Sequence, residues 1–263
     1  YLSGIKLFHA ILDVSTENFN STVLRYVLLG YEHQYKAYFV APKDRRAFTF
    51  PHLKLLAEAL SHAKMLPVDA QVIFTATTTS FFSSCRMGDI LKDSSGNNFS
   101  RLLTWTRTQI ESQDHALLYF EDPKQARREN GQVADLFSFP IKLYCPINNL
   151  QILASMQKTL GRPEHSHVFT MSKGNTLSMP HLNSILKRLL MPLLDPTLGS
   201  LSCHSFRCAI PSLMAANPAQ FTLEETVLQG DWHSDSYLLY TRHTGVGREQ
   251  THKKVVAALM ESF

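Results

Sequence analysis

The stretch "HSFRCAIPSLMAANPAQFTLEETVLQGDWHSDSYLLYTR", residues 204–242, opens with His204 and Arg207 and closes with Tyr240, shortly after a Trp-His pair. Ser202 is a candidate N-cap, which predicts that His204 and Arg207 lie on one face of the first turns of a helix. Guanidinium and imidazole groups suit the binding of a phosphate, and a phenol can act as a nucleophile. An H-x-x-R motif also occurs by chance in many proteins, so these residues alone do not establish a site.

The second half of this stretch predicts two helices joined by a short turn. Thr222 and Glu225 form the T-x-x-E pattern of a capping box, and Gly230 is a typical helix end. Trp232 and His233 then lie in the turn, where functional side chains are common. The alternative interpretation is that Trp232 anchors the core and that the following tyrosine is an ordinary surface residue.

The bulk composition predicts a globular, mildly basic protein. The chain has 263 residues, of which 44% are hydrophobic and 18% charged, which argues against disorder. Its formal net charge of +4 and pI of about 8.8 fit a nucleic-acid partner without requiring one. No apolar run is long enough for a membrane span, so no membrane partner is expected. The chain starts in mid-pattern at Tyr1, and we expect it to belong to a longer protein.

The cysteines show no CxxC pair and no His/Cys spacing typical of a metal site. We expect free thiols in a reducing compartment, and we expect no metal and no cofactor. The cysteines concerned are Cys85, Cys145, Cys203 and Cys208.

Periodicity predicts a mainly α fold with one small three-stranded antiparallel β-sheet, an α+β arrangement. A polar, Pro-bearing stretch near residues 41–47 separates a short helical part, residues 1–44, from a larger domain, residues 45–263. Strands are predicted at 101–110, 115–121 and 133–139. Helices are predicted at 1–12, 21–34, 49–63, 69–91, 147–160, 178–194 and 248–263.

Two further groups of residues have the chemistry to contact a phosphate. Arg86 lies within the predicted helix 69–91, where a buried arginine needs a partner, and Asp89 stands one turn further on. Asp89 either forms a structural salt bridge with Arg86 or orients it toward a substrate. Lys124 falls in the connection between the last two strands, where a solvated charge is the ordinary interpretation. Its basic neighbours Arg127 and Arg128 make this connection a candidate for contacting DNA, as is Lys173 further along the chain.

The order of these parts resembles the tyrosine recombinase (phage integrase) family. An arginine is followed by an acid, a hairpin lysine, an H-x-x-R helix start, a Trp-His pair and a tyrosine. The segments "LYCPINNLQIL", "HVFTM" and the helix before "CHSFR" look like the eukaryotic mobile-element branch, as in Crypton, Ngaro and DIRS-type elements. The resemblance covers roughly residues 1–250. It implies that residues 1–44 end a helical, SAM-like core-binding domain and that residues 45–263 form the catalytic domain.

The resemblance also implies a site-specific DNA recombinase of a mobile element. Tyr240 would be the nucleophile that forms a covalent 3′-phosphotyrosyl intermediate, without metal or ATP. Arg86 and Arg207 would clamp the scissile phosphate, because guanidinium forks donate bidentate hydrogen bonds that strengthen as negative charge develops. A phenol has a pKa near 10, so local cations or a base must activate it.

The remaining positions would assist this step. Lys124 would protonate the leaving 5′ hydroxyl, and His204 would act as a general acid or base near the phenol. Trp232 would contact the phosphate, but the gap from Trp232 to the tyrosine is one residue shorter than in many bacterial members. His233 is therefore an alternative candidate for this role.

One other departure from the family pattern concerns Asp89, and a second tyrosine competes for the role of nucleophile. Asp89 stands where the family often has glutamate, and it would belong to the surroundings of the phosphate rather than contact it. Tyr237 is a rival nucleophile, although it lies too close to Trp232 for the family's pattern.

Two alternative functions stay open from the sequence. A type IB topoisomerase shares the catalytic logic and would relax DNA as a monomer. A domesticated module would bind DNA without catalysis. The last helix presents Val255, Val256, Leu259 and Phe263, an apolar face that either docks on a neighbouring subunit or packs within the chain. We expect a double-stranded DNA partner, a dimer to tetramer on DNA through this helix, and a nuclear location for a eukaryotic mobile element or a cytoplasmic one otherwise.

Overall fold

In a computed structural model, the chain forms two compact units, Tyr1–Arg45 and Arg46–Phe263. The structure describes residues of the second unit only, without the side chains of residues 132, 204, 215 and 245–250. The helices predicted before residue 45, and the assignment of that part as a core-binding domain, lie outside the described residues. The described residues are 47–93, 102–120, 132–194, 201–207, 209–217, 219–222, 225 and 245–261.

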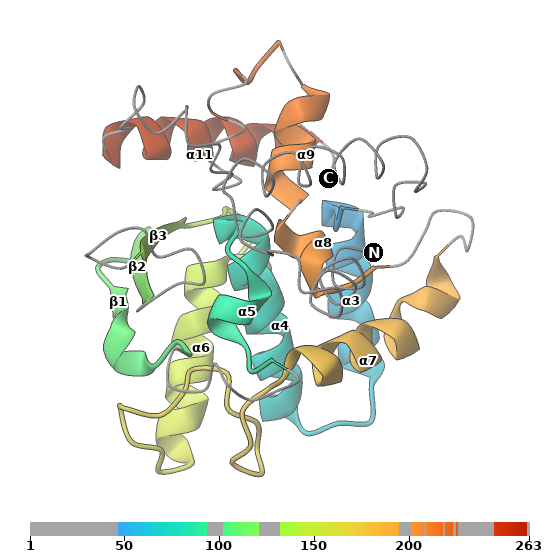
Figure 1. Cartoon of the computed structure of the whole chain (residues 1–263), viewed down its shortest axis with the longest axis vertical. Helices are drawn as coiled ribbons and strands as arrows, with labels where there is room; N and C mark the ends of the chain where they lie inside the picture. The colour runs from blue at the N-terminus through green and yellow to red at the C-terminus, as the bar shows by residue number, and fades with distance from the viewer. Residues whose placement is uncertain are drawn as a thin grey trace, which may run out of the picture. The chain divides into compact units, whose positions relative to one another are not determined.

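Helix α4 (Pro67–Ser83) lies at the centre of the second unit (Figure 1). Every residue from Val72 to Phe82 is buried, and a helix buried on all sides must be covered by its neighbours. Its threonine-rich run tolerates burial because hydroxyls donate to the helix's own carbonyls; Thr77 and Thr78 both donate to the Phe74 carbonyl. The elements that pack against α4 are α3 (Phe50–His62), α6 (Pro146–Thr159), α8 (Cys203–Arg207), α9 (Ala209–Ala216) and strand β3 (Gln132–Phe137).

Helix α4 ends earlier than the sequence predicted. The hydroxyl of Ser83 donates to the Thr79 carbonyl at 2.7 Å and accepts the Cys85 N–H at 3.2 Å, and Ser84 adopts a left-handed backbone with φ 52°. Serine side chains compete in this way for the backbone groups that would continue a helix. The helix predicted over 69–91 is therefore two helices, α4 and the short α5 (Met87–Ile90), and Arg86 lies between them rather than inside one.

The sheet has three antiparallel strands in the order β1, β2, β3, which confirms the predicted fold class. Strand β1 (Thr108–Ile110) pairs with β2 (His115–Phe120), and β2 pairs along its whole length with β3. The prediction that the first strand begins at residue 101 is wrong, because the strand starts at Thr108. Trp105–Arg107 form a turn of 3-10 helix, and the Trp105 indole N–H donates to the side-chain oxygen of Gln157 at 2.8 Å.

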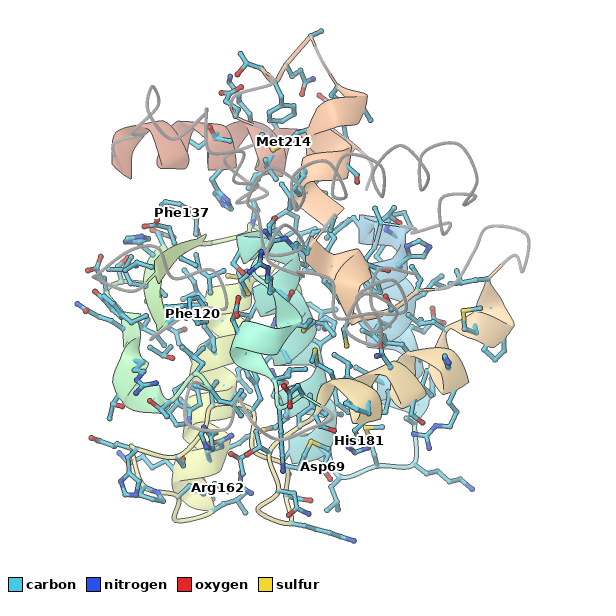
Figure 2. The ribbon with its side chains drawn as sticks, viewed as in Figure 1. Asp69, Phe120, Phe137, Arg162, His181 and Met214 are labelled. Carbon is cyan, nitrogen blue, oxygen red and sulfur yellow. The ribbon has the colours of Figure 1, made fainter. Side chains whose placement is uncertain are left out.

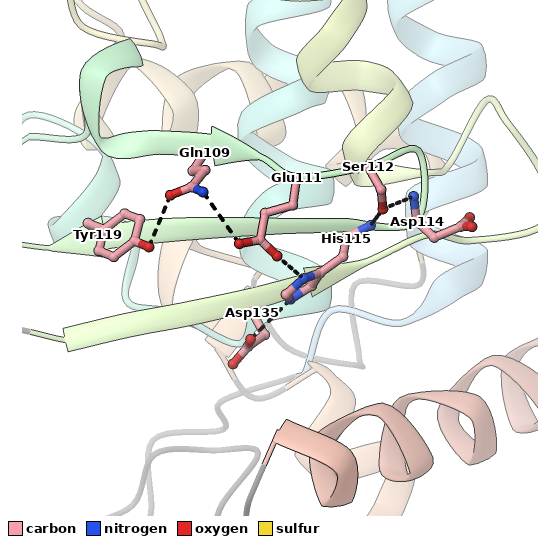
Figure 3. A network of polar contacts seen from close by, with 7 residues as sticks. All are labelled: Gln109, Glu111, Ser112, Asp114, His115, Tyr119 and Asp135. Carbon is pink, nitrogen blue, oxygen red and sulfur yellow. Dashed lines mark hydrogen bonds and ion pairs between the residues drawn. The ribbon is translucent and has the colours of Figure 1, made fainter.

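A polar network holds the three strands together at one end of the sheet (Figure 3). The ring of His115 lies between two carboxylates: Nδ1 is 2.8 Å from Glu111 Oε2, and Nε2 is 3.1 Å from Asp135 Oδ1. The same ring stacks on Phe137 with centroids 4.9 Å apart. The Ser112 hydroxyl also accepts the backbone N–H of His115. These contacts hold the strands together at this end of the sheet. The connection between β2 and β3 starts at the opposite end.

The other predicted helices that fall on described residues are present with small changes of bounds. The two helices predicted between Thr222 and Arg242 lie almost entirely outside the described residues. Thr49 is the N-cap of α3, and a proline follows in the first turn, as predicted. Helix α7 (Met179–Leu189) ends before the predicted residue 194, and a short 3-10 helix (Met191–Leu193) follows it. Helix α11 (Gly245–Glu261) is the predicted last helix. Within the described ranges, no helix combines the length and the apolar character needed to cross a membrane.

Helix α11 packs on its own chain through part of the predicted apolar face. Val255 and Leu259 are each 3% exposed and belong to the core of the second unit. The helix contacts β3, where the His252 ring nitrogen Nε2 lies 2.9 Å from the Ser138 carbonyl oxygen. Two residues of this face therefore pack within the chain, Val256 is only half-buried, and Phe263 lies outside the described residues. Docking of the helix on a neighbouring subunit stays a prediction.

The left-handed residue after α4 generates a stability prediction. Ser84 is 1% exposed, and its Oγ has no hydrogen-bond partner among the described residues. Ser84→Gly removes both this hydroxyl and the Cβ that a left-handed backbone disfavours. We expect Ser84→Gly to be more stable than Ser84→Ala by about 0.5–1 kcal/mol, after allowing for the larger unfolded-state entropy of glycine.

The measurement is urea unfolding, with the midpoint compared at an unchanged slope. Ser84→Ala is the matched control because it removes the same hydroxyl and keeps the Cβ. If the alanine variant proved as stable as the glycine variant, the left-handed backbone would carry no cost.

Candidate functional site

Helix α8 is held against α4 by a cluster of aromatic rings. Phe206 is completely buried, and its ring stacks on Phe48 with centroids 4.1 Å apart and planes 30° apart. Phe48 in turn meets Phe81, near the end of α4, edge to face at 6.4 Å. The Phe48 N–H also donates to the Ser205 carbonyl at 2.9 Å. The residue that follows Phe206 is therefore held beside the C-terminal end of α4.

The beginning of α8 is fixed from a second side by α7. The Cys203 N–H donates to the Asn183 side-chain oxygen at 2.8 Å, and the Cys203 thiol lies 3.6 Å from the Met179 carbonyl. Before the helix, the Ser202 N–H donates to the Ser205 hydroxyl at 3.0 Å. Both ends of this short helix are therefore positioned by neighbours that the sequence alone does not connect to it.

Arg207 and Asp89 lie close to the same buried thiol. Burial raises the pKa of Cys85 to about 12; a hydrogen bond with Ser83 lowers it, the Asp89 carboxylate raises it, and the Arg207 guanidinium lowers it. Arg207 is 6% exposed, and α5, which carries Asp89, packs against α8. Arg207 and Asp89 thus lie in the same region at the end of α4, where the negative charge of Asp89 offsets part of the cost of burying the positive charge of Arg207.

Arg86 directly follows Cys85 and occupies the N-cap position of α5. Its side chain is half-buried, and within the described residues its guanidinium forms no hydrogen bond or ion pair. The salt bridge considered between Arg86 and Asp89 is not formed; instead the Asp89 backbone N–H donates to the Arg86 carbonyl at 2.8 Å. Arg86 is therefore open to an added anion.

The structure brings Arg86 and Arg207 to adjacent elements, although they are far apart in the sequence. Arg86 leads into α5, Arg207 ends α8, and the two helices pack against each other. Arg207 is buried, and Arg86 is half-buried. Such a pair can receive an anionic oxygen group such as a phosphate. His204 lies one turn before Arg207 in α8, and its side chain lies outside the described part of the chain.

Several predicted site residues lie outside the described residues. The hairpin connection leaves β2 at Phe120 and enters β3 at Gln132, which are paired, so its two ends are defined by the sheet. The predicted residues for which the structure gives no placement are Lys124, Arg127, Arg128, Trp232, His233 and Tyr240.

Lys173 is separated from the arginine pair. It follows Ser172, whose N–H and hydroxyl both donate to the Asp69 carboxylate, at 2.6 and 2.8 Å, in the first turn of α4. Arg162 braces the same turn by donating to the Thr170, Met171 and Ser172 carbonyls, and Figure 2 shows Asp69 and Arg162 in the same part of the fold. A helix rises 1.5 Å per residue, so the 17 residues of α4 separate Lys173 from Arg86 by roughly 25 Å. Lys173 is exposed, and its contact with DNA stays a prediction.

The described thiols are poor candidates for a nucleophile. Cys85, Cys145 and Cys203 are buried and free, whereas Cys208 lies outside the described residues. Burial raises the pKa of Cys203 to about 12, as it does for Cys85. Among the residues that the structure describes, no group of three or more His, Cys, Asp or Glu side chains is arranged to hold a metal ion.

One polar cluster apart from the arginine pair has a member that sequence reasoning identified only as a helix cap. The predicted capping box is confirmed: the Glu225 N–H donates to Thr222 Oγ1 at 3.1 Å, and the Thr222 N–H donates to Glu225 Oε2 at 2.8 Å. The other oxygen of Glu225, Oε1, lies 2.9 Å from Lys254 Nζ and 3.5 Å from Thr251 Oγ1, both on α11. No sequence signal links Glu225 to α11, because this contact depends on how the helix returns to the domain.

Two solved structures of a recombinase align with part of this chain. A crystal structure of the XerH site-specific recombinase bound to difH substrate, a pre-cleavage complex, aligns over 79% of this chain and 53% of its own, with 12% identity and a TM-score of 0.49. A post-cleavage complex of XerH with palindromic difH substrate aligns over 78% and 51%, with 11% identity and a TM-score of 0.48. The chain thus spans about half the length of the XerH chain. No protein-family model matches the chain, and no curated protein matches it.

The buried thiols generate a chemical prediction. With a pKa of about 12, about one Cys85 or Cys203 side chain in ten thousand is a thiolate at pH 8. We expect iodoacetamide to alkylate both peptides at least about a hundredfold more slowly in the native protein than in urea, as followed by mass spectrometry. Rapid native labelling of Cys85 would contradict its burial beside Arg207.

Proposed function

We propose that the protein is a site-specific DNA recombinase that cuts and rejoins strands through a covalent link to Tyr240. The observation that supports the proposal is the packing of α5, which begins after Arg86, against α8, which ends at Arg207. The ordered set of hairpin lysine, H-x-x-R, Trp-His pair and tyrosine supports it from the sequence.

The chemistry follows from the residue types. The Tyr240 phenol oxygen attacks the phosphorus of a DNA phosphodiester and forms a phosphotyrosyl bond, while the bond from phosphorus to the 5′ oxygen breaks. The Arg86 and Arg207 guanidinium groups bind the phosphate oxygens and stabilise the extra negative charge of the transition state. Lys124 supplies the proton that the leaving 5′ oxygen takes, and His204 acts as acid or base at the phenol. The reverse attack by a 5′ hydroxyl restores the backbone and the free tyrosine.

The finer parts of the proposal extend beyond the described residues. We infer that the substrate is the terminal or joining sequence of a eukaryotic mobile element, that the protein acts in the nucleus, and that two to four copies assemble on duplex DNA. Residues 1–44 would be the end of a second DNA-contacting domain. Within this assembly Trp232 or His233 contacts the phosphate, and Arg127, Arg128 and Lys173 contact the duplex.

A type IB topoisomerase is the second candidate function. The observation that favours it is the packing of α11, whose Val255 and Leu259 are buried in their own chain rather than left exposed for another subunit. A topoisomerase needs no partner subunit. The two functions differ on a supercoiled plasmid that carries no recombination site, which a topoisomerase relaxes and a site-specific recombinase leaves unchanged.

The catalytic proposal predicts a trapped covalent adduct. A nicked duplex that contains the recombination site should yield a protein–DNA adduct stable in SDS, because the cut fragment diffuses away and cannot rejoin. Tyr240→Phe should abolish the adduct because no oxygen nucleophile is left, and Arg207→Lys should lower its rate by about a hundredfold or more, since an ammonium cannot replace the guanidinium fork.

Tyr237→Phe is the matched control, since it removes a nearby phenol and should keep the adduct. Adduct that survives Tyr240→Phe and disappears in Tyr237→Phe would move the nucleophile. If the folded protein bound duplex DNA with no adduct in any variant, it would be a non-catalytic module.

A further inference from the structure

The first turn of α7 and the residues that enter it contact the α5 region. The Met179 N–H donates to the Lys92 carbonyl at 2.8 Å, and the Lys92 N–H donates to the Leu177 carbonyl at 3.3 Å. The Met179 side chain also reaches α5, because a Cβ at Gly88 would lie only 3.8 Å from the Met179 methyl carbon. The start of α7 therefore fixes α5 and the chain just after it, and α5 begins directly after Arg86.

The same part of α7 holds the start of α8. The Cys203 N–H donates to Asn183 Oδ1 at 2.8 Å, and the Cys203 thiol donates to the Met179 carbonyl at 3.6 Å. Asn183 is half-buried and stands one turn after Met179, so both contacts come from one side of α7. The start of α7 is thus a common support for α5 and α8.

The contact from Asn183 is the one that depends most directly on a particular side chain. The hydrogen bonds between Met179 and Lys92 join backbone groups, which side-chain substitutions leave in place. Cys203 opens α8, where a backbone N–H has no acceptor inside the helix, so Asn183 supplies the acceptor that this N–H needs. Without it, α8 must shift to satisfy the N–H, and Arg207, one turn further along the same helix, moves with it.

We propose that Asn183 is a positioning residue for Arg207, an inference that rests on the proposed function. By holding the start of α8 against α7, Asn183 sets the place of Arg207 relative to α5, which the same part of α7 supports. A guanidinium fork donates two hydrogen bonds to a phosphate only within a narrow range of orientations. Asn183 thereby favours the geometry in which Arg207 receives the phosphate, without contacting the phosphate itself.

The first test measures adduct formation at a saturating concentration of the nicked duplex that traps the Tyr240 adduct. Asn183→Ala should lower the single-turnover rate by about tenfold while the Kd for the duplex changes less than about twofold, because the duplex stays bound but its phosphate is poorly oriented. Asn183→Asp should keep a rate within about twofold of the wild type, since a carboxylate oxygen can accept the same N–H.

Asn148→Ala is the matched control for this test. Asn148 is a half-buried asparagine of α6, and its side-chain N–H donates to the Lys142 carbonyl at 2.9 Å, so it also forms a hydrogen bond with the backbone. Its loss should leave the adduct rate unchanged. An Asn183→Asp variant as slow as Asn183→Ala would overturn the proposal, because the acceptor would then not be what matters.

A double-mutant cycle shows whether Asn183 acts through Arg207. Arg207→Lys removes the guanidinium fork that Asn183 is proposed to position. Adding Asn183→Ala to Arg207→Lys should therefore lower the remaining rate by less than about twofold. A further tenfold loss in the double variant would mean that Asn183 acts independently of Arg207, and the positioning role would be overturned.

A second readout does not depend on activity. Iodoacetamide should alkylate Cys203 about tenfold faster in Asn183→Ala than in the wild type or in Asn183→Asp, because loss of the acceptor loosens the turn that begins α8. Cys145, a buried thiol at the N-cap of α6, is the internal reference and should react equally slowly in all three. Unchanged labelling of Cys203 would overturn the proposal even if Asn183→Ala lost activity. Faster labelling of both thiols would indicate a general loss of stability and would overturn it as well.

The outcomes separate this inference from the proposed function. If the wild type forms no Tyr240-dependent adduct, the proposed function fails and the positioning role fails with it, whereas the labelling of Cys203 still shows whether Asn183 holds α8. If the adduct forms and Asn183→Ala makes it at the wild-type rate, only the role of Asn183 fails. If adduct rate and duplex affinity fall in proportion, Asn183 supports DNA binding in general and the positioning role is overturned.

Discussion

The stacking of Phe206 on Phe48 is the contact on which the rest of the candidate site depends. Phe206 lies inside α8, one residue before Arg207, and Phe48 bridges it to Phe81 of α4. Buried aromatic pairs contribute both area and a preferred geometry. Because the ring of Phe206 is packed in place, the next residue, Arg207, lies at the end of α4. Burial of its charged side chain costs free energy, which the packing of the neighbouring rings helps to offset.

The second constraint is the way in which α4 stops. A helix that continued to residue 91 would carry Arg86 along its axis, whereas the serines at its end turn the chain and start α5 beside α8. The hydroxyl of Ser83 exchanges hydrogen bonds with the backbone on both sides of this turn. Side-chain chemistry that is common in loops thus places the half-buried Arg86 between the two helices rather than inside one.

The two ends of the domain differ in how their polar groups are used. At the start of α4, the side chains of Asp69 and Arg162 form hydrogen bonds with backbone groups of the turn before Lys173. They therefore stabilise this turn and have little remaining hydrogen-bonding capacity for a ligand. At the end of α4, Arg86 has no hydrogen-bond or ion-pair partner among the described residues, and the neighbouring helix α8 ends at the buried Arg207. The contrast locates anion-binding capacity at one end of the helix. Glu225 adds a third case, because the carboxylate that closes a helix cap with Thr222 also binds Lys254 of the last helix.

Local sequence determined the elements that depend on local physics. The capping box of Thr222 and Glu225, the Thr49 cap of α3, the helices α6 and α11, and the presence of a small antiparallel sheet all follow from spacing and residue type, because their hydrogen bonds join near neighbours. The order of the chemically distinctive residues is likewise a property of the chain itself and needs no knowledge of how the chain folds.

Tertiary structure alone decided what depends on distant partners. It shortened the first strand where the Trp105 indole donates to Gln157, and it left Arg86 and Asp89 without the ion pair that was one of the two arrangements considered for them. It placed Lys173 away from the arginine pair, buried the face of α11 in its own chain, and brought Lys254 to Glu225. These outcomes depend on how segments that are far apart in the sequence pack together. The free energy that favours them comes from burial and packing that no short window of sequence contains.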